Sequence, residues 1–294
     1  MAWWDQHGRA WIPWKVLPNG EPPGLDQHLD PYGIWIAEVM LQQTQLSVVL
    51  FYWERWMVVF PTLDALAAAS LEQVRLQWQG LGYYSRARRL HEAAQLLLGR
   101  PWPRRLAEWM ALPGIGRTTA GSILSSAFNA PLPILDGNVK RVLARFAAVE
   151  GWPGEKAVHD RLWRMAERLT PQHRVAHYTQ AMMDLGATLC TRSKPSCLLC
   201  PLGDGCEARV LGEPTRYPGS KPRKALPVRS CVMPLLLNAD GSVWLQRRPS
   251  SGLWGGLWCP PQLDDESQLA PLLDGLQLAV HQRQDMAPLR HTFS

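Results

Sequence analysis

The chain has 294 residues, a formal net charge of +6 and six cysteines. This length is sufficient for two domains that each bury a core, and the basic excess favours a polyanionic partner. No apolar run approaches the roughly 18 residues of a membrane-spanning helix, and no N-terminal stretch has the pattern of a signal peptide. We therefore expect a soluble, cytoplasmic monomer without a membrane partner, whose cysteines serve thiolate chemistry or metal binding rather than disulfides.

Residues 1–30 are rich in Trp, Pro and Gly and predict a short helix followed by a loop. The first strong helix is predicted from Pro31 to Val49, where Glu38 is the only acid. A carboxylate in apolar surroundings is costly to ionise, so we expect its pKa to rise toward neutrality. An acid still protonated near neutral pH can donate a proton to a leaving group. A buried glutamate paired with an arginine is the alternative.

Residues 78–90 combine a turn, aromatic side chains and basic side chains. Two glycines predict the turn, two tyrosines lie at its tip and three arginines begin the next helix: Gly80, Gly82, Tyr83, Tyr84, Arg86, Arg88 and Arg89. Aromatic rings beside guanidinium groups suit a wedge that replaces a flipped base, with phosphate contacts nearby. A solvated basic helix is the alternative for the arginines.

A tight hairpin is predicted near residue 114. Pro113 ends one helix because it biases the preceding residue away from helical dihedrals, and Gly114 and Gly116 allow a turn too tight for residues with a Cβ. Arg117 then opens a second helix, whose first amides lack intrahelical partners and suit a phosphate oxygen. A glycine-containing turn between two packed helices is the alternative. About twenty residues later, Asp136 precedes another predicted helix.

Four cysteines are crowded into 17 residues, with six, two and five residues between them: Cys190, Cys197, Cys200 and Cys206. A zinc site more often pairs two Cys-x-x-Cys knuckles across a longer loop. Four thiolates with a single Cys-x-x-Cys suit a four-iron cluster, which accepts one cysteine per iron.

The composition shifts to Pro, Gly, Lys and Arg over residues 208–229, where no apolar period survives. This stretch predicts a basic linker. After it, residues 230–237 predict a strand, Asn238 to Gly241 a hairpin turn, and residues 242–246 the partner strand.

Three motifs resemble the helix-hairpin-helix DNA glycosylases related to endonuclease III, and in particular the MutY-type adenine glycosylases. They are Leu-Pro-Gly-Ile-Gly-Arg-Thr-Thr-Ala at the hairpin, Glu-Val-Met-Leu-Gln-Gln-Thr-Gln around Glu38, and the cysteine spacing. The resemblance implies a mainly α fold with an iron–sulfur cluster loop. It also implies a C-terminal α/β MutT-like domain, which we expect to be incomplete, because the family continues past a Phe-Ser-His loop and this chain stops at Phe293-Ser294.

The same resemblance assigns residues by their match to the motifs. It implies catalytic roles for Glu38, Asp136 and Asn138, with Glu38 protonating adenine. The remaining assignments are DNA contacts by Gln43, Thr44, Tyr83, Arg86, Gly114 and Gly116, an adenine pocket with Trp14 and Gln180, and cluster ligation by Cys190, Cys197, Cys200 and Cys206. Thr179 replaces the usual Asn beside Gln180.

Five segments are expected from these matches. Residues 1–30 form an N-terminal segment packing on the cluster domain, and residues 31–132 form a helical bundle that contains the hairpin. Residues 133–207 form the cluster domain, residues 208–229 the basic linker, and residues 230–294 the truncated MutT-like domain.

The implied activity is hydrolysis of the N-glycosidic bond of adenine opposite 8-oxoguanine or guanine in duplex DNA, without strand cleavage, by a protein carrying a 4Fe-4S cluster. One alternative is an endonuclease III-like glycosylase and lyase for oxidised pyrimidines. Those enzymes carry a nucleophilic Lys two residues after the second hairpin Gly, where this chain has Thr118. Another alternative is a non-catalytic DNA-binding iron–sulfur protein, against which the presence of Glu38 and Asp136 argues. The MutT-like part lacks a Gly-x5-Glu-x7-Arg-Glu pattern, so nucleotide pyrophosphohydrolysis is not expected.

Overall fold

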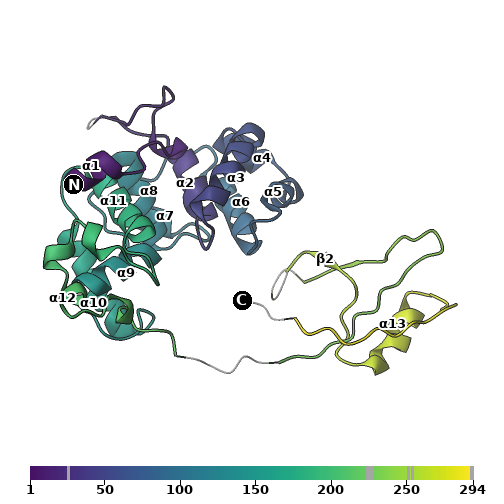
Figure 1. Cartoon of the computed structure of the whole chain (residues 1–294). Coiled ribbons are helices and arrows are strands. Elements are labelled where there is room, and N and C mark those ends of the chain that lie inside the picture. The colour runs from purple at the N-terminus through teal and green to yellow at the C-terminus, as the bar shows by residue number, and fades with distance from the viewer. Residues whose placement is uncertain (25–26, 223–227, 250–251, 253–254, 292–294) are drawn as a thin grey trace. The chain divides into compact units, whose positions relative to one another are not determined.

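The computed structural model describes residues 1–24, 27–222, 228–249, 252 and 255–291. The chain divides into two compact units, Met1–Arg223 and Lys224–Ser294. The first unit is helical, and the second contains two short strands and one helix (Figure 1). The predicted chain end at Phe293-Ser294 lies outside the described residues.

The first core of the helical unit is built by seven helices. They are α2 (Pro31–Met40), α3 (Leu46–Val59), α4 (Leu63–Ala68), α5 (Leu71–Trp78), α6 (Ser85–Leu97), α7 (Leu106–Met110) and α8 (Arg117–Phe128). The largest fully buried side chains in this core are tryptophans: Trp35, Trp56, Trp78 and Trp109. Tryptophan therefore serves mainly to fill space between helices, where it buries more apolar area than other side chains.

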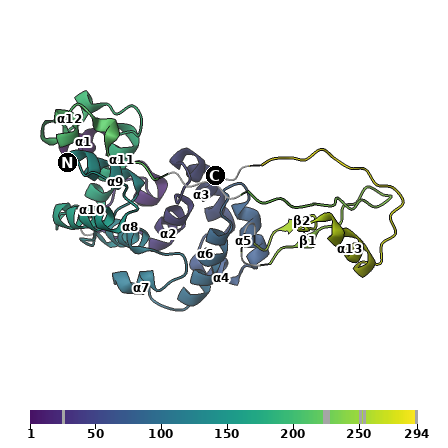
Figure 2. The ribbon, with the colours of Figure 1, turned by 90° about the horizontal axis from the view of Figure 1, so that it is seen from below.

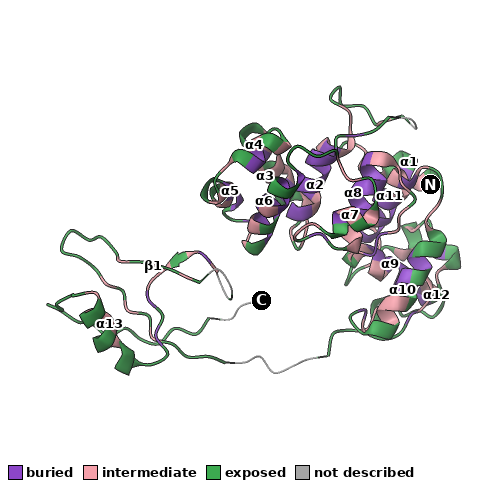
Figure 3. Ribbon diagram, turned by 180° about the vertical axis from the view of Figure 1, so that it is seen from behind, coloured by how far each residue is buried: buried purple, intermediate pink, exposed green. Residues whose placement is uncertain are grey.

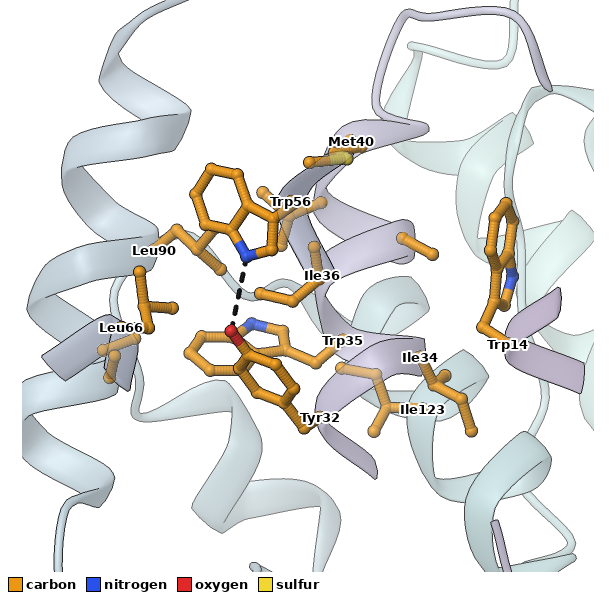
Figure 4. Close-up of a cluster of buried hydrophobic side chains, with 14 of the residues drawn as sticks. Trp14, Tyr32, Ile34, Trp35, Ile36, Met40, Trp56, Leu66, Leu90 and Ile123 are labelled. Carbon is orange, nitrogen blue, oxygen red and sulfur yellow. Dashed lines mark hydrogen bonds between the residues drawn. The ribbon is translucent and has the colours of Figure 1, made fainter. Parts of the chain in front are cut away.

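A chain of two hydrogen bonds crosses this core. Trp56 Nε1 donates to Tyr32 Oη over 3.3 Å (Figure 4), and the Tyr32 hydroxyl in turn donates to the carbonyl of Phe60 over 2.7 Å. Such bonds stabilise the core because a buried donor without an acceptor costs free energy, whereas Trp35 Nε1 is buried without a hydrogen-bond partner among the described residues. The arrangement fixes the start of α2 against the end of α3.

A second core is formed by the helices that follow in the chain. They are α9 (Gly137–Phe146), α10 (Lys156–Leu169) and α11 (Val175–Thr188), and α12 (Glu207–Val210) packs on α9. Helix α11 packs on both α8 and α9 and so joins the two cores. Helix α1 (Ala2–His7) packs here as well, since Trp3 touches this core and Trp4 Nε1 donates to Asp184 Oδ2 over 3.0 Å. The predicted segment boundaries remain a prediction.

Short 3-10 turns complete the helical unit: η1 (Pro13–Lys15), η2 (Cys197–Leu199), η3 (Gly203–Gly205) and η4 (Pro214–Arg216). Figures 2 and 3 show the helices from two other sides, and buried residues concentrate along α2 and α8. No described helix is long and apolar enough to cross a membrane.

The described part of the second unit has few helices and strands. It contains β1 (Gln246–Arg247) antiparallel to β2 (Trp258–Cys259), η5 (Glu266–Gln268) and α13 (Leu269–Gly275). The predicted turn is present, with the amide of Gly241 bonded to the carbonyl of Asn238. The predicted strand over residues 230–237 is wrong in extent, since only isolated bridges form at Val232 and Leu237. Leu237 is 68% exposed, and a hairpin whose apolar face is uncovered does not extend its ladder.

Candidate active site and DNA-facing loops

Glu38 occupies the one position of helix α2 that is not fully buried. The helix starts at Pro31 and is capped by Asp30, whose side chain accepts from the amide of Tyr32 over 3.0 Å. Nine of its ten residues are buried, and Glu38 is the exception. The surrounding apolar residues therefore lock the helix in place and leave the Glu38 side chain half-buried.

The environment of Glu38 raises its pKa, as predicted. Burial is the main cause, and nearby Asp136 adds to it, whereas Lys15 and a hydrogen bond from Ser122 act in the opposite direction. Ser122 Oγ donates to Glu38 Oε1 over 2.8 Å. A carboxylic acid held in this way keeps a proton to higher pH than an exposed glutamate does.

Helix α8 supplies two hydroxyl groups to this region, which the sequence analysis missed. Ser122 and Ser126 lie one turn apart and are both buried. Ser122 binds Glu38, and Ser126 Oγ accepts from the ammonium of Lys15 at the end of η1. Burial lowers the pKa of Lys15, while Glu38 and Asp184 raise it. The signal for this cluster was serine recurring at a four-residue interval within the buried part of α8.

Asp136 is held at the start of α9. Its Oδ1 accepts from the amide of Val139 over 2.8 Å, and its Oδ2 accepts from Asn138 Nδ2 over 3.2 Å. The preceding residue, Leu135, donates its amide to Thr118 Oγ1 over 3.4 Å. Asp136 is thus the N-cap of α9, and its carboxylate has a fixed orientation.

Asn138 is connected to the cysteine loop through Arg141. Arg141 Nη2 donates to Asn138 Oδ1 over 2.8 Å, and Arg141 Nε donates to the carbonyl of Cys190 over 2.7 Å. At Gly186 of α11, an added Cβ would lie 2.5 Å from Asn138 Cβ, so glycine is required for α9 and α11 to approach this closely. Arg141 therefore links Cys190 to Asn138, the residue whose side chain donates to Asp136.

The four cysteines of the predicted cluster line one hollow, together with residues of α9 and α11. Arg145 Nη1 lies 3.3 Å from Cys190 Sγ, and the same side chain donates to the carbonyls of Thr191 and Arg192. Burial is the main reason that the pKa of Cys200 is raised. Within the described ranges, no group of three or more His, Cys, Asp or Glu side chains is placed to hold a metal ion. Four thiols around one hollow fit a four-iron cluster, which takes one cysteine per iron.

The hairpin has the geometry that the sequence predicts. Gly114 has a φ of 81°, in the left-handed region that favours glycine. A Cβ on Gly114 would lie 3.1 Å from Arg89 Cβ of α6. Gly116 is the N-cap of α8, so the first amides of that helix follow directly. Arg89 is exposed beside this turn, and it is the arginine of α6 best placed to meet a phosphate at the hairpin.

Two loops carry the residues predicted to enter the duplex. Tyr83 is 52% exposed with a φ of 46°, and Gln43 has a φ of 63°. The predicted phosphate contact of Arg86 is corrected. Arg86 is only 8% exposed, and its guanidinium donates to protein acceptors that include the carbonyls of Gln42 and Leu81. Its helical position points it inward, whereas Arg89 points outward.

The two residues predicted for the adenine pocket are both buried. Trp14 is 4% exposed, and its ring lies 5.4 Å from that of Trp53. Gln180 is 5% exposed, and its Nε2 donates to Asp184 Oδ1 over 2.7 Å. Lys15 interacts with the charges of both Glu38 and Asp184. The adenine contacts of Trp14 and Gln180 remain predictions.

Comparisons with known proteins agree with this geometry. Residues 36–168 match the HhH-GPD superfamily of base excision DNA repair proteins, and residues 232–294 match the NUDIX domain. The adenine DNA glycosylase of Buchnera aphidicola subsp. Acyrthosiphon pisum is 32% identical over 100% of this chain and 81% of its own. The human adenine DNA glycosylase is 35% identical over 100% of this chain and 64% of its own.

Solved structures share the helical fold. A thermostable thymine-DNA glycosylase superposes with a TM-score of 0.61 at 24% identity, covering 71% of this chain and 93% of its own. A non-covalent endonuclease III–DNA complex superposes with a TM-score of 0.55 at 25% identity, covering 65% and 89%. The chain belongs to the adenine DNA glycosylases, base-excision repair enzymes built on the helix-hairpin-helix glycosylase fold with a NUDIX-like C-terminal domain.

Proposed function

We propose that this enzyme removes adenine opposite 8-oxoguanine or guanine from duplex DNA, by hydrolysis and without strand cleavage. The observation that carries the proposal is the pairing of two carboxyl groups in different environments. Glu38 is an acid with a raised pKa, and Asp136 is close enough to contribute to that rise. The raised pKa makes Glu38 the candidate acid, and the hydrogen bonds that fix the Asp136 carboxylate make it the candidate charge stabiliser.

In the proposed mechanism, adenine first leaves the base stack, because a pocket cannot reach it inside the duplex. Glu38 then donates its proton to a ring nitrogen, so that adenine departs as a neutral base. Departure leaves positive charge on the sugar, which the Asp136 carboxylate stabilises. A water molecule then adds to the sugar carbon that held the base and releases a proton to solvent, which completes the hydrolysis. Asn138 keeps the Asp136 carboxylate in place through its amide nitrogen.

Hydrolysis without lyase activity is supported by the residue at the hairpin. Thr118 occupies the position where lyases of the superfamily carry a nucleophilic lysine, and its hydroxyl already accepts the amide of Leu135. A stable Schiff base with the sugar is therefore not expected.

We further propose that Cys190, Cys197, Cys200 and Cys206 hold a 4Fe-4S cluster, as the thiols around one hollow suggest. The cluster would fix the loop and contribute no step of the hydrolysis, because hydrolysis of a glycosidic bond involves no net oxidation or reduction. Gln43, Thr44, Tyr83, Gly114 and Gly116 are proposed to contact DNA, with the enzyme acting as a monomer.

A substrate panel tests the proposed function. Single-turnover excision is measured on duplexes with adenine opposite 8-oxoguanine, guanine or thymine, with and without alkali, and with borohydride trapping. We expect excision opposite 8-oxoguanine and guanine, strand breaks only after alkali, and no trapped complex. Efficient trapping, or excision of oxidised pyrimidines instead of adenine, would contradict the proposal.

A further inference from the structure

Two residues that are predicted to enter the duplex share an uncommon backbone conformation. Gln43 and Tyr83 both have positive φ, at 63° and 46°, although neither is glycine. A side chain with a Cβ is disfavoured in this region, and it persists there only where the surrounding structure holds it. The two residues belong to different loops, one after α2 and one before α6.

One guanidinium reaches the peptide group that precedes each of these residues. Arg86 Nη1 donates to the carbonyl of Gln42 over 2.6 Å, and Arg86 Nη2 donates to the carbonyl of Gly82 over 3.2 Å. These carbonyls belong to the peptide bonds that lead into Gln43 and Tyr83. The other acceptors of Arg86 are the carbonyls of Val39, Met40 and Leu81 and the hydroxyl of Thr44.

The carbonyls of Val39 and Met40 lie in the last turn of α2, where they lack intrahelical donors. A cation at the C-terminal end of a helix satisfies such carbonyls and is favoured by the helix dipole. Arg86 therefore joins the end of the helix that carries Glu38 to both loops. Its guanidinium also lies 5.1 Å from the Trp78 ring, and Trp78 Nε1 donates to the carbonyl of Gly82 over 3.0 Å.

We propose that Arg86 is a positioning residue that holds the Gln43 loop and the Tyr83 loop in one preformed geometry for entering the duplex. This inference rests on the proposed DNA contacts of Gln43 and Tyr83. Holding both loops before binding removes an ordering cost that binding would otherwise have to meet. It also fixes the distance between the two inserted side chains and Glu38.

Two substitutions at Arg86 separate this role from a phosphate contact. Arg86→Lys keeps the charge but loses the planar fork that reaches both loops, and Arg86→Gln removes the charge as well. The positioning role predicts that both variants lose single-turnover excision by about tenfold or more, with the salt dependence of duplex binding unchanged. A phosphate contact predicts instead that Arg86→Lys stays active and that Arg86→Gln reduces the salt slope by about one. That result would overturn the proposal.

Two further readouts exclude a general loss of stability. In a double-mutant cycle with Tyr83→Ala, the positioning role predicts that Arg86→Lys costs less activity in the Tyr83→Ala background than in the wild-type protein, because part of its effect acts through the Tyr83 loop. Effects that simply multiply would contradict it. Arg100→Gln is the matched control, since Arg100 is exposed just after the same helix, and it should leave the Tyr83 cycle unaffected. If neither Arg86 variant folds, single-turnover excision by Trp78→Phe is measured instead, because this substitution removes the second donor to the carbonyl of Gly82. Full activity of folded Trp78→Phe would overturn the proposal.

A binding measurement distinguishes failure of this inference from failure of the proposed function. A duplex with 2-aminopurine beside the mismatch reports unstacking without chemistry, and wild-type protein should raise its fluorescence more than Arg86→Lys does. If wild-type protein unstacks the duplex but excises no adenine, the proposed function fails and the positioning role stands. If wild-type protein excises adenine and Arg86→Lys matches it in both assays, the positioning role fails.

Discussion

Ser122 Oγ lies 2.8 Å from Glu38 Oε1 and donates a hydrogen bond to it. A donor at this distance stabilises the charged carboxylate more than the neutral acid, and so opposes the effect of burial on the pKa of Glu38. The pKa of Glu38 thus depends on two opposed influences. Burial favours the protonated acid, and the hydrogen bond from the Ser122 hydroxyl favours the carboxylate. Lys15 acts in the same direction as Ser122.

Ser122→Ala should extend adenine excision to higher pH. Loss of the hydrogen bond raises the pKa of Glu38 further, and the rate of a proton donor falls as the pH rises through its pKa. The alkaline limb of the single-turnover pH profile should therefore move upward, and Lys15→Met should move it in the same direction. Ser125→Ala is the matched control, because Ser125 is buried but bonds to the carbonyl of Ser122 instead. A limb that moves downward in Ser122→Ala would contradict the assignment.

Glu38→Gln should be more stable than the wild-type protein at pH 7 to 8. A carboxyl whose pKa is raised in the folded state above its ordinary value of 4.5 ionises more readily in the unfolded chain. Wild-type stability is therefore reduced as the pH rises above that value, and glutamine removes this loss. Thermal unfolding measured between pH 4 and pH 8 should show a difference that grows with pH. A constant difference would mean that Glu38 is not the titrating group.

Asp136→Asn should lose excision while leaving folding almost unchanged. Asparagine caps a helix about as well as aspartate, so the bond to the amide of Val139 survives. The negative charge beside the sugar is lost, and with it the electrostatic stabilisation of the transition state, so we expect a rate lower by about 100-fold or more. A melting temperature close to that of the wild-type protein is the control. Activity near the wild-type rate would remove Asp136 from the proposed role.

The cluster prediction concerns metal content. Protein purified without oxygen should contain close to four iron and four sulfide per chain, one iron for each of the four cysteines. Cys197→Ser should give a low soluble yield, because metal binding and folding of such a loop are coupled. Cys231→Ser is the matched control, since Cys231 is exposed in the second unit. Stoichiometric zinc without iron would contradict the cluster assignment.

Local sequence patterns predicted the elements that depend on neighbours along the chain. The glycines of the hairpin, the apolar residues around Glu38 and the helix that follows Asp136 are each determined within a few residues. Arg86 was assigned to phosphate because the sequence shows three arginines at the start of one helix and does not show which faces inward. Its acceptors lie more than 40 residues away at Val39 and Met40, and only the packing of α6 on α2 reveals them.

Other features depended on contacts that no local pattern contains. Ser122 and Lys15 belong to different elements, and their relevance follows from the distance to Glu38 and Ser126. The strand predicted over residues 230–237 has suitable alternation, but a ladder needs partners, and those it finds are isolated bridges. Local propensity thus located the helices and turns along the chain. The buried hydrogen bonds of Ser122 and Lys15 could be recognised only from the three-dimensional structure.

Glu38 gives its proton to the departing adenine in the proposed mechanism. The most direct test of this role is single-turnover excision from a duplex with adenine opposite 8-oxoguanine, comparing wild-type protein with Glu38→Gln. We predict that Glu38→Gln slows excision by about 100-fold or more, the usual contribution of a general acid, while duplex affinity changes by no more than a few-fold, because the proton matters chiefly in the transition state. Excision by Glu38→Gln at close to the wild-type rate would contradict this account.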